Sequence, residues 1–96
     1  MKVYLIAWQV RCPWRDFNYA DFHNLVKNYS ESWYILMDNM YYITVKDTDD
    51  ILHITRELRQ KLYKDDSLLV QEITADCKVN GFLPSKFWKW YEENNI

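Results

Sequence analysis

A short stretch near the N-terminus carries the residues best suited to hold a phosphate group or a base. Gln9, Arg11 and Arg15 lie within a few positions of one another, with Trp8 and Trp14 interleaved. Two guanidinium groups in one loop can clamp a phosphate, while an indole ring stacks on a base. We therefore predict that these five residues form a binding site for nucleic acid or for another partner.

The same loop permits a purely structural interpretation, in which Arg11 and Arg15 pair with Asp16. Phosphate binding usually needs several cations together. The chain has 14 acidic and 12 basic residues, a formal net charge of −2, so it creates no general positive field. Any contact with nucleic acid must therefore be a local patch.

The other titratable residues are weaker candidates. His23 lies on a predicted helix face with no cysteine, serine or second histidine near it in sequence, so we expect an exposed surface residue. The acidic run over residues 47–50 resembles the start of a calcium loop, but that loop's later glycine and glutamate are missing. Turn chemistry explains Asp38, Asp65 and Asp66. The sequence thus predicts no metal site and no cofactor, and leaves the catalytic residue unassigned.

The elements that position these residues follow from the spacing of apolar side chains. The continuous β-rich run over residues 3–10 predicts a strand in the middle of a sheet. Pro13 ends this strand, and a loop follows. Apolar residues at helical spacing then predict a helix over 19–29, capped by Asn18 or Asp16 and with His23 facing outward.

The rest of the chain predicts a hairpin, a helix and a further strand. Two β-rich runs, over residues 32–36 and 40–45, flank a short polar turn and predict an antiparallel hairpin. Residues 67–73 read as the fourth strand. Between them, capping aspartates precede a second helix whose predicted apolar stripe is Ile51, Thr55, Leu58 and Leu62.

The order β-α-β-β-α-β predicts an α+β, ferredoxin-like fold, with a four-stranded antiparallel sheet and two helices on one face. A chain of 96 residues forms one domain, here with a core over residues 1–79 and a C-terminal turn and helix over 80–96. Residues 74–79 read as either a short fifth strand or a linker. The last helix has too many rings for one face, so we expect part of it to meet a partner or the open sheet face through Phe87, Trp88, Trp90 and Tyr91.

The composition favours the cytoplasm. The two cysteines are far apart and form no CxxC pair, which is typical of a reducing compartment. The longest apolar stretch near the N-terminus, over residues 3–8, is much shorter than a bilayer span. We therefore expect no membrane contact.

Several motifs occur in one order along nearly the whole chain. These are Trp33–Leu36, Tyr42–Val45, Asp49–Ile51, Asp65–Val70 and Asn80–Pro84. Their order resembles the SinR-type hypothetical proteins, which are relatives of the small Cas-two subunit of the CRISPR spacer-integration complex and of VapD-type toxin ribonucleases. The resemblance implies a ferredoxin-like homodimer whose two sheets face each other, with the C-terminal segment helping to cover the neighbouring subunit.

The resemblance also bears on activity. In nuclease members of the wider family, an aspartate at the end of the first strand is proposed to hold a magnesium ion across the dimer interface, and the matching position here is Gln9. A neutral amide binds Mg²⁺ more weakly than a carboxylate does and cannot act as a base. We therefore expect a non-catalytic binding or scaffolding module with a defence-related role, in CRISPR, toxin–antitoxin or phage counter-defence systems.

Two alternatives stay open. One is an endoribonuclease of the VapD or Cas-two type, either metal-independent and organised by Arg11, Arg15 or His23, or dependent on Mg²⁺. The other is an inhibitor that docks an exposed edge or its aromatic tail on a host protein.

Overall fold

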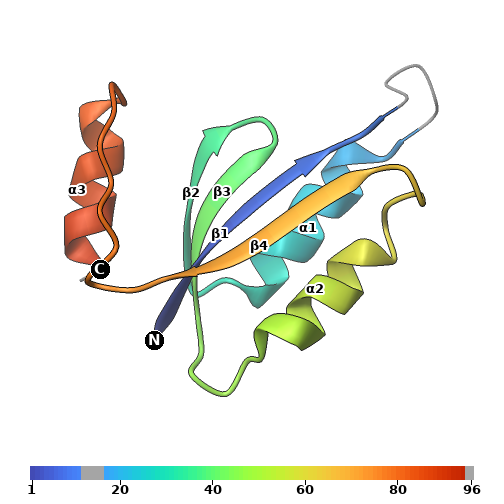
Figure 1. Ribbon diagram of the computed structural model, residues 1–96, viewed down its shortest axis with the longest axis horizontal. Coiled ribbons are helices and arrows are strands. Elements are labelled where there is room, and N and C mark those ends of the chain that lie inside the picture. Colours follow the sequence, from blue (N-terminus) through green and yellow to red (C-terminus); the bar gives the residue numbers. More distant parts are fainter. Residues whose placement is uncertain (12–16, 95–96) are drawn as a thin grey trace.

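The computed structural model describes residues 1–11 and 17–94. Its four strands form one antiparallel sheet in the order β2-β3-β1-β4. Helices α1 and α2 lie on one face of the sheet and α3 lies on the other (Figure 1). The predicted α+β, ferredoxin-like fold is confirmed, with the elements β1 (Lys2–Gln9), α1 (Tyr19–Tyr29), β2 (Ser32–Met37), β3 (Met40–Val45), α2 (Ile51–Arg59), β4 (Ser67–Ile73) and α3 (Ser85–Glu93).

The strand β1 is central, as its continuous apolar sequence predicts. It pairs with β3 on one side and β4 on the other. Its side chains Tyr4, Ile6 and Trp8 are buried beneath the helices. On the opposite face Leu5 and Ala7 are half-buried, because that face is covered over part of its extent. The expectation of burial on both faces is therefore met along the helix side and, on the opposite face, at Val3 alone.

Side-chain caps begin α1 and α2. The Asn18 carboxamide oxygen accepts the Asp21 backbone N–H at 2.9 Å, and an Asp50 carboxylate oxygen accepts the Leu52 N–H at 3.1 Å. Such bonds satisfy backbone donors that have no partner within the first turn. Asn18 was one of two predicted caps; the other, Asp16, lies outside the described residues.

Helix α2 buries a stripe that differs from the predicted one at a single position. Ile54 and Leu58 are fully buried, whereas Thr55 is half-buried and its hydroxyl donates to the Ile51 carbonyl at 2.7 Å. A period of 3.6 residues places 54 and 58 on one face. The stripe therefore passes through Ile54 in place of Thr55.

Two apolar clusters lie on opposite sides of the sheet. The open-face cluster is centred on Val3, Tyr42 and Phe87, with half-buried side chains around them. The helix-side core is larger, and its buried members are Tyr4, Ile6, Trp8, Val10, Phe22, Val26, Tyr41, Ile43, Val45, Ile54, Leu58 and Leu62.

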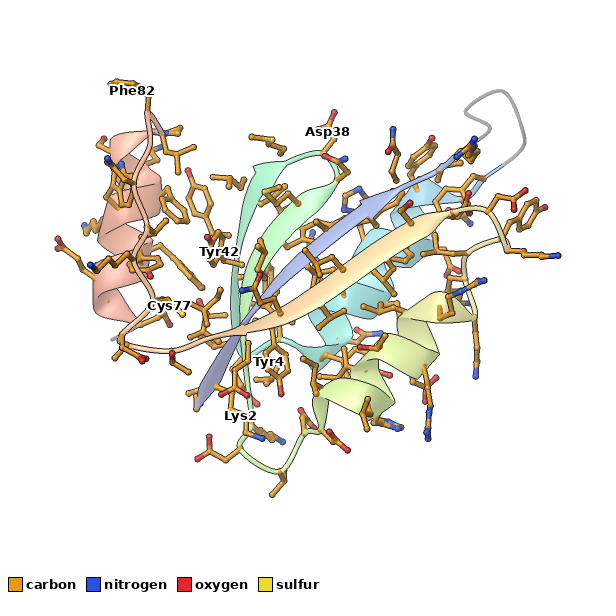
Figure 2. All side chains as sticks on the ribbon, in the orientation of Figure 1. Lys2, Tyr4, Asp38, Tyr42, Cys77 and Phe82 are labelled. Carbon is orange, nitrogen blue, oxygen red and sulfur yellow. The ribbon has the colours of Figure 1, made fainter. Side chains whose placement is uncertain are left out.

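Helix α3 supplies much of the open-face cluster. Phe87 is fully buried, with its ring centroid 5.1 Å from that of Tyr42 and 5.5 Å from that of Tyr34. The Trp90 indole N–H donates to the Ser32 hydroxyl at 2.8 Å. Figure 2 shows Tyr42 between the sheet and α3. Of the two placements expected for the aromatic helix, the one on the open sheet face is therefore observed, and Phe87 is an internal anchor of this chain.

The segment before α3 is a linker. Residues 74–84 contain turns and coil, so the alternative of a short fifth strand over 74–79 is wrong. Within residues 1–11 and 17–94, no helix has the length and apolar character needed to cross a membrane.

Candidate functional site

A pocket opens at the end of β1, between the start of α1 and the turn that joins β2 to β3. We call it the β1-end pocket, and its volume is about 490 Å³. Figure 2 places Asp38 at the tip of the β2–β3 hairpin. The pocket is lined by Trp8, Gln9, Val10, Tyr19, His23, Asp38 and Asn39.

The inner wall of the β1-end pocket is Trp8. This side chain is 4% exposed, and its ring lies 4.5 Å from that of Phe22 between centroids. Its indole N–H donates to the Tyr41 hydroxyl at 3.2 Å. A ring packed in this way has no free face for a base, so the stacking role considered for Trp8 is wrong for this structure. Tyr19 is the exposed ring of the pocket, at 44%.

His23 continues the hydrogen-bond chain that starts at Trp8. Its Nδ1 is hydrogen-bonded to the Tyr41 hydroxyl. The indole N–H of Trp8 can only donate, so the Tyr41 hydroxyl oxygen accepts its hydrogen bond. The Tyr41 hydroxyl then donates its own proton to Nδ1 of His23. We therefore assign a neutral His23 that carries its proton on Nε2. Burial lowers the pKa of His23, with a further lowering by Lys27, against an opposing effect of Asp38.

Tyr41 stays protonated across the physiological range. Burial raises the pKa of Tyr41 to about 12, although the hydrogen bond from Trp8 opposes this. The hydroxyl thus remains a donor to His23.

The expectation that His23 faces outward is wrong, because the hydroxyl of Tyr41, on β3, is hydrogen-bonded to the His23 ring on α1. His23 stands one position after Phe22 and three before Val26, which is the signal that would have placed it beside the apolar stripe.

The hairpin turn supplies the outer polar groups. Asp38 and Asn39 form the two-residue connection between β2 and β3. The Trp8 backbone N–H donates to the Asn39 carbonyl at 3.0 Å, which holds the turn beside the end of β1. The sequence predicts the turn itself, but its position over Gln9 depends on the pairing of β1 with β3.

Gln9 separates the β1-end pocket from a second, more polar pocket of about 240 Å³. This pocket is lined by Gln9, Arg11, Asp65 and Ser67. The Arg11 backbone N–H donates to an Asp66 carboxylate oxygen at 2.9 Å, which fixes the start of the loop. The structure therefore brings Gln9 and Arg11 together as predicted.

The remaining two residues of the predicted patch, Trp14 and Arg15, lie outside the described residues. Among residues 1–11 and 17–94, no three histidine, cysteine or acidic side chains converge in a group that could hold a metal ion. The β1-end pocket is thus mostly apolar, and the polar residues that line it supply one imidazole, one carboxylate and two carboxamides.

Comparison with known proteins supports the fold. No protein-family model and no curated protein matches the chain. A crystal structure of the hypothetical protein TT1823 from Thermus thermophilus is similar, with a TM-score of 0.55 and 21% sequence identity, over 86% of this chain and 94% of that one. The likeness places this chain in the class of α+β, ferredoxin-like domains.

Proposed function

We propose that this chain is a non-catalytic, homodimeric binding or scaffolding module of the SinR-type and Cas-two-like group, acting in the cytoplasm in a defence-related setting. The observation that carries the proposal is Gln9, an exposed residue at the end of the central strand. It occupies the position at which nuclease relatives carry an aspartate. Its amide can donate and accept hydrogen bonds, but it is a poor Mg²⁺ ligand and no base.

The open sheet face supports the dimer. Gln9 lies opposite Ser67 in the β1–β4 register, and Leu69 opposite Ala7 continues the same face. Leu69 is 52% exposed, whereas Ile73 further along β4 packs in the open-face cluster with Phe87. A second copy placed face to face would bury Leu69 and bring the two Gln9 amides near the two-fold axis.

Sedimentation equilibrium at several concentrations tests the dimer. We expect a dimer at micromolar concentration that becomes a monomer on Leu69→Glu, because the change places a charge in an apolar interface. Leu52→Glu is the matched control, since Leu52 is 62% exposed on α2, on the other side of the sheet. A strictly monomeric wild-type protein would contradict the proposal, as would a dimer that survives Leu69→Glu.

Incubation with single- and double-stranded RNA and DNA, with and without Mg²⁺ or Mn²⁺, tests the lack of catalysis. We expect no cleavage under any of these conditions. Specific cleavage that is lost on Arg11→Ala and retained on Arg56→Ala, a change at an exposed residue of α2, would overturn the proposal.

One observation favours metal-independent endoribonuclease activity as the second candidate function. His23 lines the β1-end pocket and its Nδ1 is held by Tyr41. With its proton on Nε2, the neutral imidazole can donate a hydrogen bond to a phosphate oxygen of RNA and stabilise the charge that develops there during cleavage. This candidate predicts metal-independent RNA cleavage that disappears on His23→Gln and persists on His53→Gln, since His53 is an exposed residue of α2.

A further inference from the structure

The β1-end pocket has the size and lining of a small-molecule site. Its volume of about 490 Å³ lies within the usual range for ligand pockets. Such sites combine apolar walls with a few polar groups that fix orientation. Here aromatic residues and Val10 form the walls, and the polar residues that line the pocket are Gln9, His23, Asp38 and Asn39. This combination suits a flat heterocycle with hydrogen-bonding edges.

The carboxylate of Asp38 decides which heterocycle fits best. A carboxylate accepts two hydrogen bonds side by side and donates none. Guanine presents two adjacent donors, N1–H and the 2-amino group. Adenine and cytosine place an acceptor nitrogen beside their amino group, and uracil flanks its N3–H with two carbonyls, so each of these bases repels a carboxylate. Repulsion of the wrong ligand is an effective source of specificity.

The other side chains complement the acceptor edge of guanine. O6 and N7 require donors, which the Nε2–H of His23 and the amide groups of Gln9 and Asn39 can supply. Tyr19 is 44% exposed at the pocket, and an exposed aromatic ring stacks on a base.

A phosphate attached to the base belongs outside this pocket, because the residues that line it include Asp38 and no lysine or arginine. The second pocket offers a place for it. That pocket contains Arg11 and Ser67 as donors beside Asp65, and it shares Gln9 with the β1-end pocket. A guanidinium group binds phosphate well.

We propose that the β1-end pocket binds the guanine base of a nucleotide, with its phosphate directed toward Arg11. The nucleotide is either free or the end of an RNA, since both present the same base. The inference rests on the proposed function in placing the ligand at this end of β1, but it requires no second copy of the chain.

Titration of guanosine 5′-monophosphate into the full-length, ¹⁵N-labelled protein tests the inference. We expect shifts of the Gln9, His23 and Asn39 amide signals. Binding should be at least about 10-fold tighter than that of adenosine or inosine 5′-monophosphate, because inosine lacks the amino group. A short RNA with a terminal guanosine separates the two sources: tighter binding than the mononucleotide indicates an RNA end, and equal binding indicates the free nucleotide.

The variant Asp38→Asn should lower the affinity for guanosine 5′-monophosphate at least about 10-fold and remove the preference over adenosine. Asp76→Asn is the matched control, because Asp76 is an exposed residue of the linker before α3. Equal affinity for the three nucleotides, no binding, or an unchanged Asp38→Asn variant would overturn the inference. A monomer that binds guanine contradicts the dimer alone, whereas a dimer that does not bind it contradicts this inference alone.

Discussion

The two faces of the sheet are built in different ways. The helix-side core is closed by α1 and α2, and its central side chains Ile6, Ile43 and Ile54 are fully buried. On the open face, α3 covers one region with a few aromatic rings, and Leu69 is left 52% exposed. The helices thus close their side over β1 and β3, while Trp33 and Ile35 of β2 stay 43% and 42% exposed on the same side. The open face is covered only in part, by α3.

The helix-side core and the open-face cluster also contribute to stability in different ways. The helix-side core joins residues from most of the chain, whereas the open-face cluster depends on a short helix reached through the linker 74–84. Elements with few buried contacts open locally before the whole domain unfolds. We therefore expect damage to the two faces to have different consequences.

Phe22→Ala should have the largest effect. Phe22 is 1% exposed in the helix-side core, and its loss leaves a cavity, so we expect a decrease of about 3–5 kcal/mol in the free energy of unfolding. Chemical denaturation followed by far-UV circular dichroism measures this. Leu52→Ala, at an exposed position on α2, is the control and should change the value by less than about 0.5 kcal/mol. A decrease below about 1 kcal/mol for Phe22→Ala would show that Phe22 contributes little to the stability of the helix-side core.

Phe87→Ala should release α3 and leave the sheet folded. Its ring is fully buried, so we expect the free energy of local unfolding of α3 to fall by up to about 3 kcal/mol. Hydrogen exchange should speed up for the amides of α3 and stay slow for those of β1. Phe82→Ala is the same chemical change at a fully exposed ring and should have little effect. If Phe87→Ala lowers the stability of the whole sheet as much as Phe22→Ala does, the two faces form one cooperative unit.

Ser32→Ala should weaken the docking of α3 by about 1 kcal/mol. It removes the acceptor of the Trp90 indole N–H, which is bound at 2.8 Å. Faster exchange of the Trp90 indole proton in NMR spectra is the direct measurement. Ser67→Ala, at an exposed serine of β4, should leave that proton unchanged. An indole proton that exchanges at the same rate in Ser32→Ala would rule out this contribution.

The smallest expected effect is a pH dependence of the free energy of unfolding, caused by His23 on the helix side of the sheet. Burial lowers the pKa of His23 in the folded chain, so the unfolded chain binds the proton first as the pH falls. This contribution is present above the unfolded pKa of about 6.5 and is lost as the pH falls from there toward the lowered folded value. Denaturation midpoints between about pH 5 and pH 7.5 should show this loss in the wild type and in His53→Gln, but not in His23→Gln. Identical pH profiles for all three proteins would contradict it.

Much of the fold follows from local patterns. The continuous apolar run of β1, the polar turn at Asp38 and the caps before α1 and α2 each define an element without reference to the others. The α+β class then follows from element order. The partial coverage of the open face does not, because the packing of Phe87 depends on how the linker returns the chain to the sheet.

The candidate site was predicted in part. The sequence predicts Gln9 and Arg11 in one site because they are neighbours along the chain, and both line the second pocket. It predicts an outward His23 because the partner of this residue, Tyr41, lies on another element. The hydrogen bond between His23 and Tyr41 joins residues of different elements, so no local sequence pattern indicates it.

The elements, their order and the amide at the end of the central strand follow from the amino-acid sequence, because short-range periodicity and capping encode these properties. Three features require tertiary contacts: the burial of Trp8, the link from Trp8 through Tyr41 to His23, and the cover of part of one face by α3. The bonded pairs Trp8–Tyr41 and His23–Tyr41 are 33 and 18 positions apart. The strand register and the packing of α1 on the sheet bring them together, and both are set cooperatively by the whole core.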